Sequence, residues 1–111
     1  MIQGGLFDDK LSEKLSPIEH ETTEVTGILH KDGVISMARS TPGTASSEFF
    51  ICIGSQPELD YNGKRNPDGQ GFAAFGKVIE GMEVVRKIQN LPDKDQYLVS
   101  PVEITKIEKV K

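Results

Sequence analysis

The stretch Ser46-Ser47-Glu48-Phe49-Phe50-Ile51-Cys52-Ile53 places two adjacent aromatic residues inside a short apolar run. β-Branched and aromatic residues over so few positions, introduced by serines and followed by Gly54-Ser55, are typical of a strand, because a helix needs a longer run. Successive side chains of a strand point to opposite faces, so Phe50 shares its face with Glu48 and not with Phe49. The sequence therefore predicts a strand with two different faces.

The role of Phe50 has two interpretations. In one, its ring lines a pocket beside the Glu48 carboxylate, an arrangement that suits a small apolar ligand group. In the other, Phe49 and Phe50 are both core residues of a strand that is buried on both faces. The spacing of the residues leaves both interpretations open.

The turn signal Asp32-Gly33 precedes an alternating segment, which predicts a strand over Val34–Ala38 that pairs with Phe49–Ile53. Between these strands, residues 39–47 are rich in Ser, Thr, Gly and Pro. Such a loop has backbone amides and carbonyls that can meet an extended ligand. A further strand is expected over Phe72–Val78.

One helix is predicted, over Gly81–Asn90. Its apolar residues Met82, Val85 and Ile88 are spaced three apart, which is typical of an amphipathic helix. Leu91-Pro92 ends it, since proline restricts the residue before it and cannot donate a hydrogen bond. The alternation that begins at Val102-Glu103-Ile104 predicts a final strand with a bulge before Ile107.

Residues 7–26 are polar and lack a sustained period, which predicts a long surface loop with at most a helical turn around residues 9–14. His20 lies among glutamates, and a metal site is one hypothesis for it. A metal needs convergent ligands, whereas carboxylates in a polar loop are normally solvated, so we expect no metal at His20 or at His30. Nor does the sequence contain a nucleophile-elbow motif for hydrolysis.

The bulk properties narrow the class of protein. A chain of 111 residues predicts a single domain over residues 1–111, and a net charge of -4 argues against binding nucleic acid through phosphates. No run is long and apolar enough to span a bilayer, so no membrane association is expected. The lone Cys52 excludes an internal disulfide. A cytoplasmic location is expected, with periplasmic and secreted locations left open.

Several separate segments resemble the cyclophilin-type peptidyl-prolyl cis-trans isomerases, in the order and at the spacings of that family. The turn Met37–Ser40 and the loop Asn66–Gly71 resemble those of bacterial members of that family. It covers nearly the whole chain, through the segments Gly33–Ser40, Pro42–Ile51, Leu59–Asp60, Gly71–Val78 and Gly81–Val85.

The resemblance implies a groove for proline-containing peptides. Phe50 is matched to the floor of its proline pocket, and the other pocket positions fall on Met1, Leu59 and Phe72. Gln3 is matched to the groove, although its spacing alone describes only a polar residue before the Gly4-Gly5 turn.

The remaining matched positions lie on either side of the same groove. Ala38, Arg39 and Ser40 are matched to the positions that give the peptide main-chain contacts. Glu48 stands where many members have Gln, and because an ionised Glu can only accept hydrogen bonds, any bond donated to the substrate from this position is in doubt.

The implied fold is mainly β, a cyclophilin-like antiparallel barrel. The family's catalytic Arg belongs to a Phe-His-Arg segment that precedes the strand at Met1–Gly5, and the sequence begins at Met1. We therefore expect an N-terminally incomplete barrel whose exposed strand edges pair two chains into a homo-oligomer.

The implied activity is prolyl isomerisation in protein folding, with proline-containing peptides or unfolded proteins as partners, no cofactor, and a rate reduced for want of that Arg. The alternative is a proline-peptide binding module without catalysis.

Overall fold

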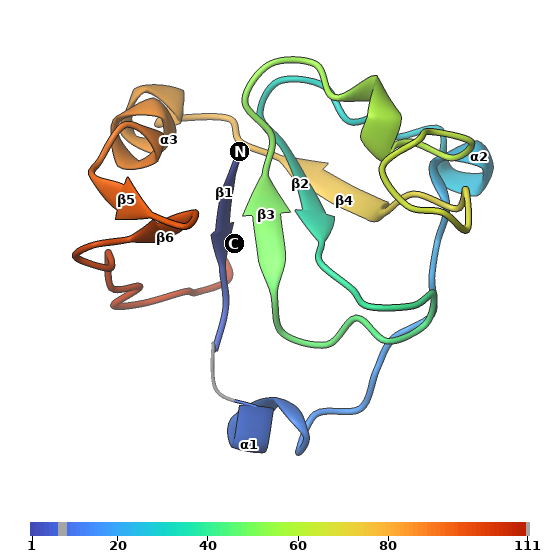
Figure 1. Cartoon of the computed structure of the whole chain (residues 1–111), viewed down its shortest axis with the longest axis horizontal. Coiled ribbons are helices and arrows are strands. Elements are labelled where there is room, and N and C mark those ends of the chain that lie inside the picture. The colour runs from blue at the N-terminus through green and yellow to red at the C-terminus, as the bar shows by residue number, and fades with distance from the viewer. Residues whose placement is uncertain (7–8, 111) are drawn as a thin grey trace.

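The computed structural model describes residues 1–6 and 9–110, and its centre is a four-stranded antiparallel sheet (Figure 1). The strands follow the order β1-β3-β2-β4. Their bounds are β1 Ile2–Gly4, β2 Val34–Met37, β3 Phe49–Ile51 and β4 Ala73–Lys77. The predicted pairing of the second strand with the third is confirmed, and so is the strand expected over Phe72–Val78. The fold is mainly β, with antiparallel sheets and few helices.

The strand register lines up one row of residues across the centre of the sheet. Gln3 of β1 lies opposite Phe50 of β3, which lies opposite Ser36 of β2. Directly paired residues of antiparallel strands point to the same face. Phe50 is therefore flanked on its own face by a polar side chain from each neighbouring strand.

The two faces of β3 are covered differently. On one face Phe50 and Cys52 are buried at 3% and 0% exposure. On the other face lies Phe49, where the C-terminal segment crosses: a Cβ on Gly4 would meet Cδ1 of Ile104 at 3.3 Å and Cζ of Phe49 at 3.4 Å. Glycine at this position permits the close approach of that segment.

The predicted helix is confirmed as α3, Met82–Gln89, and its only buried residue is Val85. It follows Gly81, whose φ of 92° is a left-handed conformation that suits glycine, and it ends before Asn90. Figure 1 shows α3 beside the hairpin of β5 and β6, at the edge of the molecule beyond β1.

Two expectations about the C-terminal third are corrected. The sequence predicted a strand at Val102-Glu103-Ile104, but residues 101–110 pair with no strand in the described part of the chain, so the expected bulge is absent there too. Ile104 instead approaches Gly4 closely. A hairpin that was not predicted, β5 Asp93–Lys94 with β6 Tyr97–Leu98, precedes it.

The hairpin turn explains why the sequence did not reveal it. Asp95 and Gln96 both have positive φ, 53° and 73°, which is the backbone of a type I′ turn. Asn or Asp followed by Gly is the usual sequence of that turn, and a Gln in the second position hides it.

The long N-terminal loop contains two short helices, α1 Asp9–Ser12 and α2 Thr23–Thr26. The turn expected around residues 9–14 is thus confirmed, whereas α2 was missed, and the part of the expected loop at residues 7–8 lies outside the described residues. Thr22 caps α2 by accepting from the Val25 amide, and Gly27 ends it with φ 75°.

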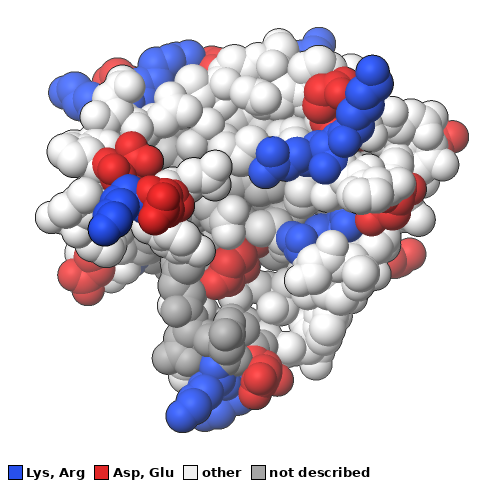
Figure 2. All heavy atoms as spheres, in the orientation of Figure 1, with Lys and Arg blue, Asp and Glu red and all other residues white. Residues whose placement is uncertain are grey.

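The outer surface carries mixed charge. In the view of Figure 2, Lys and Arg side chains alternate with Asp and Glu side chains. Within residues 1–6 and 9–110, no helix is both long enough and apolar enough to cross a bilayer.

Candidate functional site

Four of the residues matched to the family's groove meet in one apolar cluster. Phe50 and Leu59 are buried at 3% and 4% exposure, and Ala38 and Phe72 pack against them together with Cys52. The rings of Phe50 and Phe72 meet edge to face, with centroids 5.3 Å apart. We call Phe50, Leu59 and Phe72 the aromatic cluster, after its two phenylalanine rings. Because Phe50 is so deeply buried, it is a core residue, and any ligand contact is confined to a small part of its ring.

Local structure explains how Leu59 and Phe72 reach Phe50. Leu59 ends a 3-10 turn, η1 Pro57–Leu59, which begins with a proline at its first position. The amide of Phe72 donates to the carbonyl of Leu59 over 3.0 Å, so the loop between them closes on itself. Gly71 has φ 63°, and a Cβ there would lie 2.4 Å from the Leu59 oxygen, so only glycine fits.

Gln3 and Met1 come to this region on the neighbouring strand. Gln3 is exposed and lies opposite Phe50 in the register of β1 with β3. Met1 precedes β1 and is 37% exposed. By the alternation of a strand, Met1 and Gln3 point to the face that carries Phe50.

The segment Ala38–Ser40 borders the cluster, and the amides of Ala38 and Ser40 are already hydrogen-bonded. The Ala38 amide donates to the Glu48 carbonyl over 2.9 Å, and the Ser40 amide donates to the hydroxyl of Thr44 over 3.0 Å. The expectation of a loop with free amides is thus corrected at Ser40, whose amide bonds within the loop. At either residue, the backbone group left to contact a peptide is the carbonyl. The Ser40 carbonyl already accepts a hydrogen bond from the Arg39 side chain.

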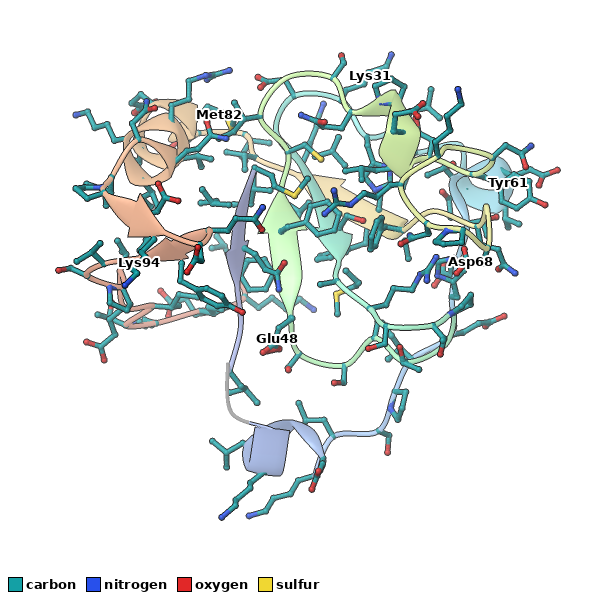
Figure 3. All side chains as sticks on the ribbon, in the orientation of Figure 1. Lys31, Glu48, Tyr61, Asp68, Met82 and Lys94 are labelled. Carbon is teal, nitrogen blue, oxygen red and sulfur yellow. The ribbon has the colours of Figure 1, made fainter. Side chains whose placement is uncertain are left out.

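Glu48 lies just before β3, below that strand in Figure 3. Its carboxylate accepts a hydrogen bond from the Ser47 hydroxyl. It also lies against the backbone of Gly5, since a Cβ on Gly5 would overlap Glu48 atoms at 2.7 to 2.9 Å. The structure therefore places Glu48 beside the turn after β1.

The side chain of Arg39 is buried, although the sequence drew attention only to its backbone. Only 1% of the side chain is exposed. Nε donates to the Gly71 carbonyl over 3.0 Å, and the two terminal nitrogens donate to Gly71, Ser40 and both carboxylate oxygens of Asp68. Its guanidinium carbon lies 5.2 Å from the centre of the Phe72 ring. All five N–H groups of the guanidinium are thus engaged.

Arg39 lowers the pKa of its partner Asp68. The hydrogen bonds from Arg39 hold the pKa of Asp68 below its usual value of 3.8, and the amide of Gln70 adds to this effect. Figure 3 shows Asp68 in the loop at the side of the sheet. The pair is therefore charged at neutral pH, which strengthens its hydrogen bonds.

A buried polar network lies behind Phe50, and sequence reasoning missed it. His30 is 1% exposed and Ser36 fully buried. Nδ1 of His30 lies 2.7 Å from Oδ1 of Asp60, and its Nε2 lies 2.8 Å from the hydroxyl of Ser36. His30 thus bridges Asp60 and Ser36 through its two ring nitrogens. We call this set the His30 network.

The His30 network has the order of a Ser-His-Asp catalytic chain but not its access. A nucleophilic serine must reach a substrate carbonyl, and Ser36 has no exposed surface. The network therefore serves packing, and no local sequence signal distinguishes His30 from a loop histidine. The other histidine, His20, lies with Nε2 3.3 Å from the Gln70 carbonyl.

We next consider whether any side chains are arranged to bind a metal ion. In the part of the chain that the structure describes, no group of three or more His, Cys, Asp or Glu side chains is placed to hold an ion. The Asp32 carboxylate, in the turn before β2, forms an ion pair with Arg86 at 2.9 Å. Its pKa is lowered, chiefly by the amide of Gly54 and also by Arg86.

Comparison with known proteins assigns the family. The model of the cyclophilin type peptidyl-prolyl cis-trans isomerases matches residues 1–109. The chain belongs to this family. It is 43% identical over 95 residues to a peptidyl-prolyl cis-trans isomerase of Acinetobacter baylyi, covering 83% of this chain and 47% of the relative. It is 34% identical over 94 residues to peptidyl-prolyl cis-trans isomerase B of Escherichia coli, covering 82% of this chain and 55% of that relative.

Solved structures agree with this assignment. A cyclophilin type isomerase of Cryptosporidium parvum superposes with a TM-score of 0.64 and 26% identity, over 87% of this chain and 58% of the other. A structure of that protein in the presence of the dipeptide Ala-Pro gives a TM-score of 0.59, over 75% and 48% of the two chains. This cyclophilin chain spans about half the length of the curated relatives it matches.

Proposed function

We propose that this cyclophilin chain binds proline-containing peptides at the aromatic cluster and accelerates rotation about their X-Pro bonds. The observation that carries the proposal is the convergence of Phe50, Leu59 and Phe72 on the sheet face where Gln3 lies opposite Phe50. An apolar cluster with a polar group beside it suits the ring of a proline and the amide next to it. The similar Cryptosporidium parvum structure with Ala-Pro supports the same ligand class.

The physical demands of the reaction are modest. X-Pro bonds interconvert over a barrier of about 18–20 kcal/mol, and no bond is broken. A protein must hold the proline ring, fix the flanking residues and stabilise the twisted amide. We assign the first demand to the aromatic cluster and the second to Gln3. Neither a metal nor a cofactor is required.

A second candidate, peptide binding without turnover, is favoured by the state of Arg39. Removing a preorganised donor from a comparable site costs about 10²–10³ in rate. Arg39 is the arginine that touches the aromatic cluster, and all of its donors are engaged by Asp68, Gly71 and Ser40. It can therefore assist a twisted amide only by giving up bonds that it already makes.

A protease-coupled assay on an Ala-Pro peptide separates the two candidates. Under the isomerase proposal, the cis-to-trans rate rises in proportion to protein concentration. Under the binding proposal, the rate stays at the spontaneous value while the peptide still binds. An Arg39→Gln variant, run beside the wild type, shows whether this guanidinium takes part in any turnover.

Partners and compartment are part of the same proposal. Unfolded bacterial proteins with exposed prolines are the expected clients, in protein folding, and the cytoplasm is the expected compartment. A second copy of the chain is a further expected partner, through β4, which has β2 as its only sheet neighbour among the described residues. An unpaired strand edge is a template for another strand.

A further inference from the structure

The side chain of Arg39 links two parts of the chain that lie far apart in sequence. It follows β2, while its partners Asp68 and Gly71 belong to the loop that leads into β4. The shortest of its bonds, 2.6 Å, joins a terminal nitrogen to the Gly71 carbonyl. Both carboxylate oxygens of Asp68 are held at 3.0 Å by different nitrogens, which is the bidentate geometry that fixes orientation as well as distance.

The loop that Arg39 holds is followed directly by Phe72, the last residue before β4. The residue after Gly71 places its ring edge to face on Phe50 at 5.3 Å, under the guanidinium of Arg39. Three contacts thus determine where the Phe72 ring lies: the cation–π contact of its face with Arg39, the edge contact with Phe50, and the hydrogen bond that the Phe72 backbone amide donates to the Leu59 carbonyl.

We infer that Arg39 is a positioning residue, which with Asp68 clamps residues 68–71 so that Phe72 is held against Phe50 in the geometry that receives a proline ring. The ligand of this inference, a prolyl peptide, rests on the proposed function, whereas the clamp itself does not. It assigns to the Arg39 side chain a role that differs from the main-chain peptide contact implied by family resemblance.

Burial distinguishes this pair from an ordinary surface ion pair. Exposed ion pairs contribute little to stability. Arg39 has only 1% of its side chain exposed, and its removal would leave the Ser40 and Gly71 carbonyls without this donor. Lysine cannot replace it, because an ammonium is a point charge that lacks the planar fork of guanidinium.

The chain supplies a matched control. Arg86 also binds an aspartate through its guanidinium, with one terminal nitrogen 2.9 Å from both oxygens of Asp32. That pair is exposed, with 48% and 43% of the two side chains accessible, and it joins α3 to the turn before β2. Arg86→Lys therefore makes the same chemical change away from the aromatic cluster.

The test compares Arg39→Lys, Asp68→Asn and Arg86→Lys in the full 111-residue chain. Two properties are measured by NMR: hydrogen exchange of the Phe72 amide without ligand, and the dissociation constant of an Ala-Pro peptide. We expect both clamp variants to speed exchange at Phe72 and to weaken the peptide about tenfold, while Arg86→Lys changes neither. Asp68 is 32% exposed, so Asp68→Asn tests the clamp even if Arg39→Lys fails to fold.

The outcomes separate the clamp from the proposed function. If Phe72 exchange is the same in Asp68→Asn as in the wild type, the clamp is wrong, whatever the peptide does. If exchange rises but peptide affinity does not change, Arg39 is structural only and the positioning role is overturned. If the wild type binds no prolyl peptide while the clamp variants still speed exchange, the clamp stands, and the proposed function fails together with the ligand part of the inference.

Discussion

The imidazole of His30 lies stacked beside the ring of Phe50, with centroids 6.0 Å apart and planes inclined by 15°. The same imidazole is hydrogen-bonded to Asp60 on one side and to Ser36 on the other. A polar ring that is fixed at both nitrogens thus forms one wall of the aromatic cluster. The position of Phe50 depends on this network as well as on apolar packing.

The first prediction concerns the His30 network. His30→Ala leaves a cavity and removes the partner of buried Ser36, and we expect it to lower the free energy of unfolding by about 2–5 kcal/mol. His20→Ala is the control, since His20 makes one 3.3 Å contact to a loop carbonyl, and we expect a change within about 0.5 kcal/mol. Urea unfolding measures both. Equal stabilities of the two variants would show that the network contributes nothing.

The second prediction concerns Phe50 itself. Because Phe50 is 3% exposed, Phe50→Ala should lower the free energy of unfolding by about 3–5 kcal/mol. Phe50→Leu keeps an apolar side chain and should keep the fold, yet bind a prolyl peptide about tenfold or more weakly, since it loses the aromatic surface. Phe49→Leu, on the opposite face, is the control and should not change peptide affinity. Unaltered affinity in a folded Phe50→Leu variant would remove Phe50 from the binding site.

The third prediction concerns Cys52 and pH. Burial raises the pKa of this thiol from 9.0 to about 11. Between these values the unfolded chain loses a proton that the folded chain keeps, so stability is lost as the pH rises from about 9 towards 11, by roughly 1.4 kcal/mol for each pKa unit. The loss should be smaller in Cys52→Ala, measured by urea unfolding at pH 8 and pH 10.5. Identical pH dependence in both proteins would contradict the shifted pKa.

The fourth prediction concerns the edge of the sheet. If two chains pair through β4, sedimentation should show a dimer that forms as concentration rises. Phe75 in this strand is 57% exposed, and Phe75→Lys should weaken the dimer, because charged residues on edge strands oppose pairing. Tyr97→Lys, at a 71% exposed position of β6, is the control. A monomer at all concentrations would reject the pairing.

The sequence predicted those parts of the fold whose signals are local. The apolar run around Phe50 and the Asp32-Gly33 turn gave two strands and their pairing, and the spacing in residues 82–88 gave α3. The strand expected at 102–104 failed, because alternation reports a half-buried extended segment whether or not a partner strand lies beside it. Ile104 lies close to Gly4 without any ladder of hydrogen bonds.

The candidate site was predictable through its apolar residues and not through its polar ones. Family motifs located Phe50, Leu59 and Phe72, and the structure brings them together. The bonds of Arg39 to Asp68 and of His30 to Asp60 span 29 and 30 positions, so no local pattern reveals them. Likewise, the amide of Ser40 was expected to be free because a sequence does not show the contacts within a loop.

The claim that prolyl peptides bind at the aromatic cluster is tested most directly by titrating the ¹⁵N-labelled chain with an Ala-Pro peptide and following its amide resonances. The account predicts saturable shifts concentrated at Gln3, Phe50, Leu59 and Phe72, with little change in α3 or in the β5–β6 hairpin. A glycine-substituted peptide without proline should leave the same resonances in place. Shifts that cluster elsewhere, or none at millimolar peptide, would contradict the assignment of the site.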